Sequence, residues 1–170
     1  MTLRRKPFMV ETPYRPTLLF DGGDDLLAIT EYAGIVNIWA AGGTAEAKVA
    51  VNDITGLKII FSKEDPVLAN NLGWAFYIKG SQVAAYHRWG TTVGTWLTPV
   101  GTITPGRAYH VTDSYNDAST SEDPTIHVDG VAHTIANGLL TETSTPSGVY
   151  RSDSTFDLRI GLRSNDSSPM

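Results

Sequence analysis

Three aspartates within five residues form the densest group of potential ligands in the sequence. They are Asp21, Asp24 and Asp25, with Gly22 and Gly23 between the first and the other two. Carboxylate and backbone oxygens are the ligands that Ca²⁺ takes, so this stretch is a candidate calcium site. The spacing differs from that of an EF-hand, and Asp and Gly are also ordinary turn residues. The sequence therefore predicts either a metal site or a tight turn here, and it indicates no other cofactor.

The histidines and the remaining acidic residues do not form a recognisable catalytic set. On a hairpin that turns at Asp129-Gly130, His127 and His133 face opposite sides, which argues against a shared metal. Glu64-Asp65 and Glu122-Asp123 are adjacent pairs, and neighbouring side chains on a strand point to opposite faces. We therefore expect a protein without catalytic residues.

Two groups of aromatic residues are candidates for contact with a glycan or a protein partner. Tyr77 and Tyr86 fall on the more polar face of a hairpin predicted over residues 74–88, and Trp89 and Trp96 sit in or beside loops. Sugar rings stack on exposed aromatic side chains of this kind. The same residues also fit a simpler interpretation, in which they form the outside of a sheet and pack against their own domain.

The composition excludes several classes of protein. A chain of 170 residues suits one domain with a core of its own. A net charge of -5 argues against nucleic acid as the main partner. The absence of cysteine rules out disulfides and thiolate metal sites. No stretch approaches the ~20 apolar residues of a transmembrane helix, so we expect no membrane partner.

Short apolar and alternating segments separated by turn residues predict an all-β protein. Gly80-Ser81 and Asp129-Gly130 are typical two-residue hairpin turns, because Gly takes a positive φ without strain. Further strands are expected over residues 17–20, 26–29, 35–40, 57–62, 96–97, 108–115 and 156–161. Residues 45–52 fit a helical turn or a strand, and the alternation of Ala47, Val49 and Val51 favours a strand. About ten or more strands without a convincing helix predict a two-sheet antiparallel sandwich.

Two polar residues are predicted on apolar faces of these strands. His87 shares a face with Trp74, and we expect it to be a hydrogen-bonded core histidine. Asp113 falls on the same side of its strand as Tyr109 and Val111. A carboxylate in such surroundings needs hydrogen bonds or a cation, unless that part of the face reaches solvent.

Residues 1–16 are predicted to form an extended N-terminal arm ahead of a single sandwich domain over residues 17–170. Pro7, Pro13 and Pro16 remove backbone donors and prevent a helix. The residues expected to dock on another surface are Arg4, Arg5, Lys6, Phe8 and Tyr14. A disordered terminus is the alternative. No apolar run follows the basic cluster, so we do not expect a secretory signal.

Seven short segments match, in order, the strand and turn motifs of one superfamily. They are Leu19-Phe20-Asp21-Gly22-Gly23-Asp24-Asp25, Ile38-Trp39, Ile60-Phe61-Ser62-Lys63, Gly73-Trp74-Ala75-Phe76-Tyr77-Ile78, Tyr109-His110-Val111-Thr112, Ile126-His127-Val128-Asp129-Gly130 and Leu158-Arg159-Ile160-Gly161. This pattern resembles the concanavalin A-like lectin/glucanase superfamily, in its laminin-G-like and pentraxin-like branch. The resemblance implies a jelly-roll sandwich, and because the matched positions are structural it implies no activity.

The chain departs from that pattern in two places. Glucanases of the superfamily carry paired carboxylates in an E-x-D-x-x-E strand, and none of the six Glu residues begins such a pattern. A glycoside hydrolase is therefore the least supported function. The family also continues after Leu158-Arg159-Ile160-Gly161 with another strand, which residues 164–170 cannot supply. We expect the arm or a neighbouring chain to fill this place, or an open edge to remain for strand addition.

These features favour a non-enzymatic structural protein of a virus particle, either a capsid decoration (cement) protein or part of a tail or fibre. A free-standing laminin-G-like domain without a secretion signal is similar to phage structural proteins, in which the arm and open edge would be contact devices. The expected partners are a major capsid or other virion protein and further copies of the chain, for example in a homotrimer. The alternative is an extracellular or virion-borne lectin-like module that binds host-surface carbohydrate, with or without Ca²⁺.

Overall fold

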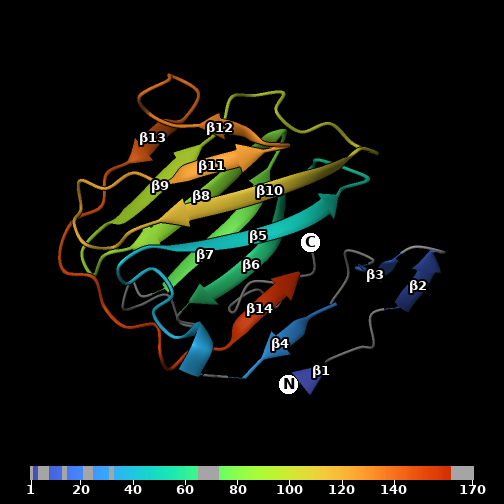
Figure 1. Ribbon diagram of the computed structural model, residues 1–170, viewed down its shortest axis with the longest axis horizontal. Helices are drawn as coiled ribbons and strands as arrows, with labels where there is room; N and C mark the ends of the chain where they lie inside the picture. The colour runs from blue at the N-terminus through green and yellow to red at the C-terminus, as the bar shows by residue number, and fades with distance from the viewer. Residues whose placement is uncertain are drawn as a thin grey trace.

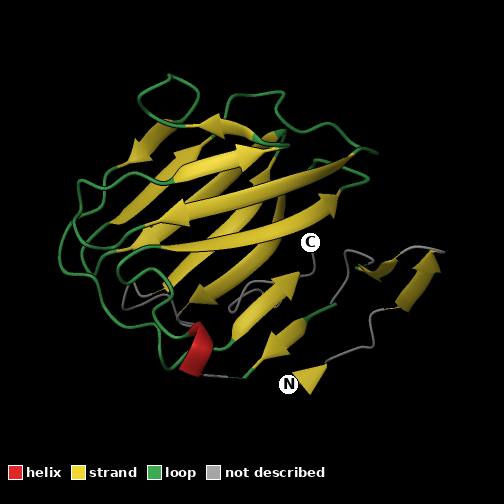
Figure 2. Cartoon of the chain, viewed as in Figure 1, coloured by secondary structure: helices red, strands yellow, loops and turns green. Residues whose placement is uncertain are grey.

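Two antiparallel sheets face each other in the computed structural model, and a short hairpin stands beside them (Figure 1). The structure describes residues 2–3, 8–12, 15–20, 25–30, 33–64 and 73–161. In these ranges the one helical element is the 3-10 turn η1 (Ala33–Ile35), and the remaining regular structure is strand (Figure 2). No helix within them is long and apolar enough to cross a membrane. The predicted all-β class with two antiparallel sheets is confirmed.

Among the described residues, the larger sheet has eight strands, all antiparallel to their neighbours. Their order across the sheet is β1 (Thr2–Leu3), β4 (Leu27–Ile29), β14 (Leu158–Gly161), β6 (Leu57–Glu64), β7 (Gly73–Lys79), β8 (Gln82–Arg88), β9 (Val93–Leu97) and β13 (Thr141–Ser144). Strands from both ends of the chain therefore meet at one side of this sheet, where β4 pairs with β14.

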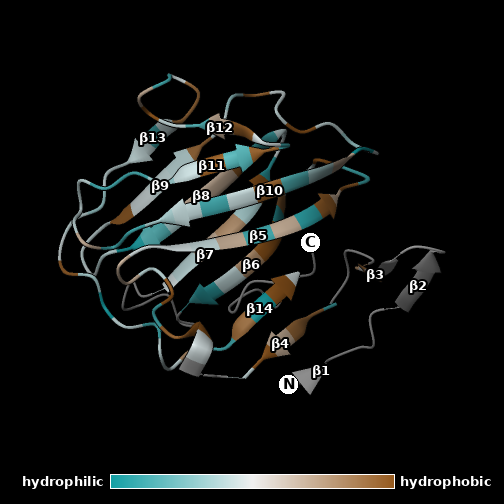
Figure 3. Ribbon diagram, viewed as in Figure 1, coloured by the Kyte–Doolittle hydropathy of each residue, from teal (hydrophilic) through white to brown (hydrophobic). Residues whose placement is uncertain are grey.

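The smaller sheet has four strands in the part of the chain that the structure describes, in the order β12 (Val131–His133), β11 (Thr125–Val128), β10 (Ala108–Tyr115) and β5 (Gly43–Ala50). Strand β5 pairs with β10 along its whole length, from Gly43 opposite Tyr115 to Ala50 opposite Ala108. Exposed and half-buried residues alternate along β5, and its hydropathy alternates in the same way (Figure 3). One face of this sheet therefore meets the core and the other meets solvent, as the period of two requires.

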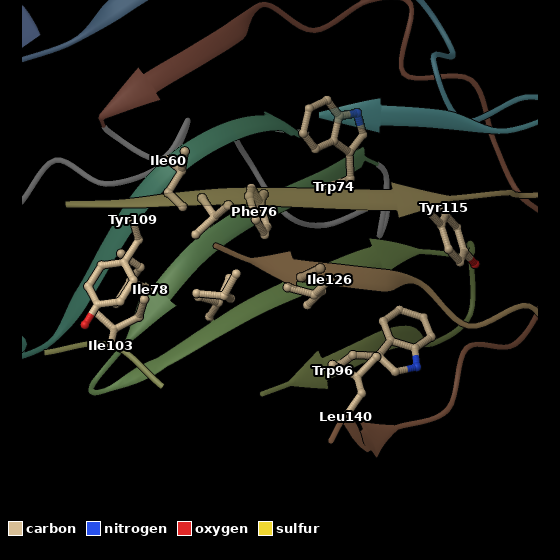
Figure 4. Close-up of a cluster of buried hydrophobic side chains, with 14 of the residues drawn as sticks. Ile60, Trp74, Phe76, Ile78, Trp96, Ile103, Tyr109, Tyr115, Ile126 and Leu140 are labelled. Atoms are coloured by element: carbon tan, nitrogen blue, oxygen red, sulfur yellow. The ribbon is translucent and has the colours of Figure 1, made fainter. Parts of the chain in front are cut away.

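Aromatic and branched side chains from both sheets fill the space between them (Figure 4). Trp74, Phe76 and Ile78 point inward from β7, and Val111 and Ile126 approach them from the smaller sheet. All five are at most 2% exposed. Burial of such side chains is the main favourable term in folding.

Both predicted two-residue turns are confirmed. Asp129 and Gly130 have φ values of 50° and 82°, so both central residues of that turn adopt the positive φ that a type I′ turn needs. The register pairs Val128 with Val131. Gly80 has a φ of 58° between β7 and β8, where Ile78 lies opposite Val83 as predicted.

Three predicted elements need correction. The prediction of an apolar strand over residues 35–40 is wrong. Residue 35 ends η1 and residues 36–41 form turns, in which Asn37 and Ala41 have positive φ values of 50° and 66°. Strand β6 continues to Glu64 instead of ending at Ser62. Strand β13 (Thr141–Ser144) lies where no strand is predicted.

The N-terminal region contains strands of its own. Strand β1 extends the edge of the larger sheet beside β4. Strands β2 (Phe8–Thr12) and β3 (Arg15–Leu19) pair with each other as a separate sheet that stands off from the sandwich (Figure 1). The arm predicted over residues 1–16 therefore contains a hairpin that continues to Leu19.

Candidate functional site

Two pairs of ionisable side chains are completely buried inside the sandwich. Lys63 pairs with Asp153, and His87 pairs with Asp113. All four side chains have no solvent-exposed surface. Buried charges are rare unless they are paired, so these residues are the first place to look for function.

Asp153 is held by hydrogen bonds from three other segments of the chain. Lys63 Nζ lies 3.0 Å from Asp153 Oδ1 and also donates to the Asp153 carbonyl oxygen. Trp74 Nε1 donates to Oδ2 at 2.9 Å, and the backbone N–H of Asn37 donates to Oδ1 at 2.8 Å. The N–H of Asp153 in turn donates to Asn37 Oδ1 at 3.0 Å. A carboxylate with both oxygens occupied in this way holds segments together and is not free to act as a base.

Strand register explains why Lys63 is buried. It lies directly opposite Trp74 in the ladder between β6 and β7, and paired residues share a face. Because Trp74 faces the core, Lys63 must also point inward, where only a carboxylate makes its charge tolerable.

His87 and Asp113 connect the two sheets across the core. His87 comes from β8 and Asp113 from β10, and His87 Nε2 lies 3.3 Å from Asp113 Oδ2. The imidazole stacks on Tyr115 with ring centroids 3.9 Å apart, and it meets Trp39 in a T-shaped arrangement with ring centroids 4.9 Å apart. The prediction that His87 is a hydrogen-bonded core residue is confirmed. Of the alternatives left open for Asp113, the structure shows a buried carboxylate with a hydrogen-bonding partner.

Further polar groups surround this pair without reaching solvent. Trp89 Nε1 donates to the Tyr115 hydroxyl at 2.9 Å, and burial raises the pKa of Tyr115 well above its usual value. Burial also raises the pKa of Tyr150, whose hydroxyl is buried without a hydrogen-bond partner in the described part of the chain. His87 Nδ1 and Asp113 Oδ1 are also buried without a hydrogen-bond partner among the described residues. Because the side chains of the His–Asp pair are fully enclosed, a substrate has no direct access to it, and the arrangement is suited to positioning the sheets.

The predicted aromatic contact surface is wrong. Trp89 and Trp96 are 4% and 0% exposed, because both indoles pack in the sandwich core. Tyr77 and Tyr86 are each 6% exposed and belong to a second buried cluster, which includes Ala75 and Ala84 on the other face of β7 and β8. The Tyr86 hydroxyl donates to the buried carboxylate of Glu64. None of these four side chains offers a face on which a sugar could stack.

The predicted metal and docking residues lie largely outside the described residues. Asp21 and Asp24 belong to a stretch that the structure does not describe, and so do Arg4, Arg5, Lys6 and Tyr14. Asp25 precedes β4, and Phe8 begins strand β2. Within the ranges given above, no three His, Asp or Glu side chains come together as a metal site would require.

An open depression at one end of the smaller sheet is lined mainly by polar residues. Its volume is about 320 Å³, and it lies between the beginning of β5 and the loop that follows β10. The lining residues are Gly42, Gly43, Thr44, Ser114, Tyr115, Asn116, Glu122 and Asp123. Hydroxyl, amide and carboxylate groups of this kind suit a hydrophilic ligand.

Sequence reasoning missed Asp153 and the structural role of Lys63. The usable signal was the parity of β6: a strand that continues through Lys63 places this residue on the same face as Phe61, opposite Trp74 in the ladder. Asp153 follows a Ser-rich connection and carries no local signal, because its partners lie 79 to 116 residues away. Comparison with known proteins adds no guide to the site: no protein-family model matches the chain, and no curated protein matches it.

Replacing Asp153 by Asn should lower the free energy of unfolding by about 3–5 kcal/mol, because Lys63 is then left as a buried charge without its counter-ion. Urea unfolding followed by fluorescence measures this loss. Lys63→Met combined with Asp153→Asn should cost less than the sum of the two single changes. Lys79→Met removes an exposed lysine and serves as the control. A loss below about 1 kcal/mol for Asp153→Asn would contradict the proposed role of the pair.

Asp117 should make the protein less stable as the pH rises above about 4. Partial burial raises its pKa above the usual 3.8, Asp153 adds to this shift and His87 opposes it. The folded chain therefore binds the proton more tightly than the unfolded chain. This stabilisation is present at low pH and is lost as the pH rises from 3.8 through the raised pKa of the folded chain. Asp117→Asn should raise the melting temperature at pH 7 and not at pH 3. The rise should be small, because solvent screens this site. An equal change at both pH values would contradict the assignment.

Proposed function

We propose that this protein is a non-enzymatic structural component of a virus particle, either a capsid decoration protein or part of a tail or fibre. The observation that carries the proposal is the β2–β3 hairpin, which stands off from the sandwich and pairs with no other strand among the described residues (Figure 1). A two-stranded hairpin alone is marginally stable in water. Such an element gains stability when it docks on a neighbouring subunit, which is how attachment arms work.

The sandwich supports this proposal as a scaffold. The two-sheet arrangement is compatible with the concanavalin A-like jelly roll that the sequence resembles, and such domains occur in phage structural proteins. Strand β1, which comes from the predicted arm, pairs with β4 at the edge of the larger sheet. The partner of the hairpin would then be a major capsid protein, another virion protein or a further copy of the chain.

The positions of the carboxylates support a non-enzymatic role. A glycosidase needs two carboxyl groups facing one cleft, about 5–10 Å apart. In this chain Asp153 is bonded to Lys63, Asp113 to His87, and Glu64 accepts a hydrogen bond from Tyr86. These buried acidic groups are committed to structural contacts.

Particles assembled without this protein provide the test of the proposal. The purified full-length chain should sediment with such particles, and replacement of residues 8–19 by a Gly-Ser linker of equal length should weaken binding at least about tenfold, or about 1.4 kcal/mol. Val100→Ser changes a valine that is 80% exposed and should bind normally. Failure of the full-length chain to bind any assembled shell or tail would refute the proposal.

A carbohydrate-binding module is the second candidate function, and the open depression favours it. Thr44 and Ser114 are hydrogen-bonded to each other at 2.8 Å at its rim, and Glu122 adds a carboxylate. Polar groups that converge in this way could recognise sugar hydroxyls, with or without Ca²⁺. A phage surface protein with this property would attach to host glycans.

A glycan array with calcium and with a chelator tests this second function. Binding to a specific glycan should be reduced by Glu122→Gln, because the carboxylate lines the depression. Sensitivity to the chelator would support a calcium-dependent site. Absence of binding to every glycan, or binding unaffected by Glu122→Gln, would remove the depression as a sugar site.

A further inference from the structure

Strand β5 presents a long open edge. It pairs with β10 on one side, and no strand in the described ranges pairs with its other side. The strand has eight residues, of which Thr44, Glu46, Lys48 and Ala50 are exposed. A long edge of unpaired backbone groups is a template for strand addition.

The two sheets differ in width on this side of the molecule. The larger sheet has eight strands and the smaller sheet four, and the larger sheet continues beyond β6 with β14, β4 and β1 (Figure 1). Leu158 of β14 is only partly buried against the core. Ala47 and Val49 of β5 are also only partly buried. Strands added to β5 would cover these residues and make the two sheets more equal in width.

We infer that strand β2 of one copy of the chain adds to the open edge of β5 in another copy. The hairpin supplies a free edge and β5 supplies the acceptor, so each chain carries both halves of the contact. The smaller sheet would then have the order β12, β11, β10, β5, followed by β2 and β3 of the second copy. Main-chain hydrogen bonds would provide the affinity and the side chains the register.

One antiparallel register fits the residues of both strands. When Glu11 is opposite Lys48, Val10 is opposite Val49 and Phe8 is opposite Val51. This register joins opposite charges on the solvent side and apolar residues on the core side, and both kinds of pair are stabilising. A shift that placed Glu11 opposite Glu46 would oppose two like charges, which is destabilising.

The position of Pro16 indicates which strand of the hairpin pairs. Pro16 lies in β3, opposite Glu11 of β2. Proline has no N–H to donate and is confined to edge strands of a sheet. Strand β2 therefore suits the inner position beside β5, and β3 suits the new outer edge.

The donor and acceptor surfaces differ, so the contact is heterologous. Contacts of this type close into rings when the rotation between copies allows it and otherwise form open filaments. A closed trimer would be one such ring. This inference rests on the proposed role of the hairpin as a contact device, but it concerns the purified chain alone and fails or succeeds independently of binding to a particle.

Cysteine cross-linking tests the contact directly, because the chain has no cysteine of its own. Two single variants, Glu11→Cys and Lys48→Cys, are mixed under mild oxidation. Residues directly opposite each other on paired strands have Cα atoms within the range that a disulfide spans. We expect a cross-linked heterodimer on non-reducing gels. The Glu11→Cys variant mixed with Lys79→Cys, which has its cysteine on the other sheet, is the matched control and should not cross-link.

A charge-exchange cycle tests the register without a covalent bond. Glu11→Lys alone or Lys48→Glu alone places like charges opposite each other and should weaken association roughly two- to five-fold in sedimentation equilibrium. The double variant restores opposite charges and should restore association. These surface changes leave the core intact, so the fold is expected to persist.

Three outcomes would overturn the inference. One is the absence of a cross-link between the Glu11→Cys and Lys48→Cys chains. Another is a double variant, with Glu11→Cys and Lys48→Cys in one chain, that stays monomeric and forms the disulfide within that chain. This result would place the hairpin on the β5 edge of its own chain. The third is self-association that is insensitive to all the charge changes, which would locate the contact between copies elsewhere.

Discussion

The buried carboxylate of Asp153 is the constraint on which the packing of this sandwich depends. Asp153 accepts hydrogen bonds from the ammonium group of Lys63, the indole of Trp74 and the backbone of Asn37. These partners come from β6, β7 and the turn after η1, so one side chain fixes three segments at one end of the molecule. Removing any partner would leave a buried polar group unsatisfied, which is far more costly than the net gain from forming the bond.

The His87–Asp113 pair provides a second polar constraint between the sheets. Apolar packing alone tolerates small sliding of one sheet over the other, because hydrophobic contact has little directionality. A hydrogen bond between β8 and β10, with Tyr115 stacked on the imidazole, is satisfied in only one relative position. We interpret this pair as a device for specificity of packing, which also explains why a histidine and an aspartate occupy core positions without an accessible site around them.

The sequence predicted those parts of the fold that depend on short-range chemistry. The turns at Gly80-Ser81 and Asp129-Gly130 follow from the conformational freedom of glycine, and β5 follows from the alternation of Ala47, Val49 and Val51 with polar residues. Residues 35–40 were misread because an apolar run fits a strand as well as a buried turn. The positive φ values of Asn37 and Ala41 end any strand there. Asn tolerates this conformation and was a weak signal for a turn, whereas Ala41 carries no such signal in its residue type.

The candidate site was less predictable than the fold, for physical reasons. The partners of Lys63 and Asp153 are set by tertiary packing, and neither residue carries a motif. Trp89 and Trp96 are predicted in or beside loops, either as a contact surface or packed against their own domain, and their indoles turn inward and donate to Tyr115 and Asp123. Adjacency to a loop does not determine exposure, since a large amphipathic ring reaches the core from a strand end.

The long sequence separation across the Asp153 cluster has a consequence for how the chain folds. Lys63 and Asp153 are 90 residues apart, and Asn37 and Asp153 are 116 residues apart. Contacts between such distant residues carry a large loop-closure cost and slow the folding of β-sandwiches. During synthesis on the ribosome, β6 and β7 emerge long before the aspartate that neutralises Lys63. The interior can therefore close only after residue 153 has been made, and until then the nascent chain holds an uncompensated cation where its core will form.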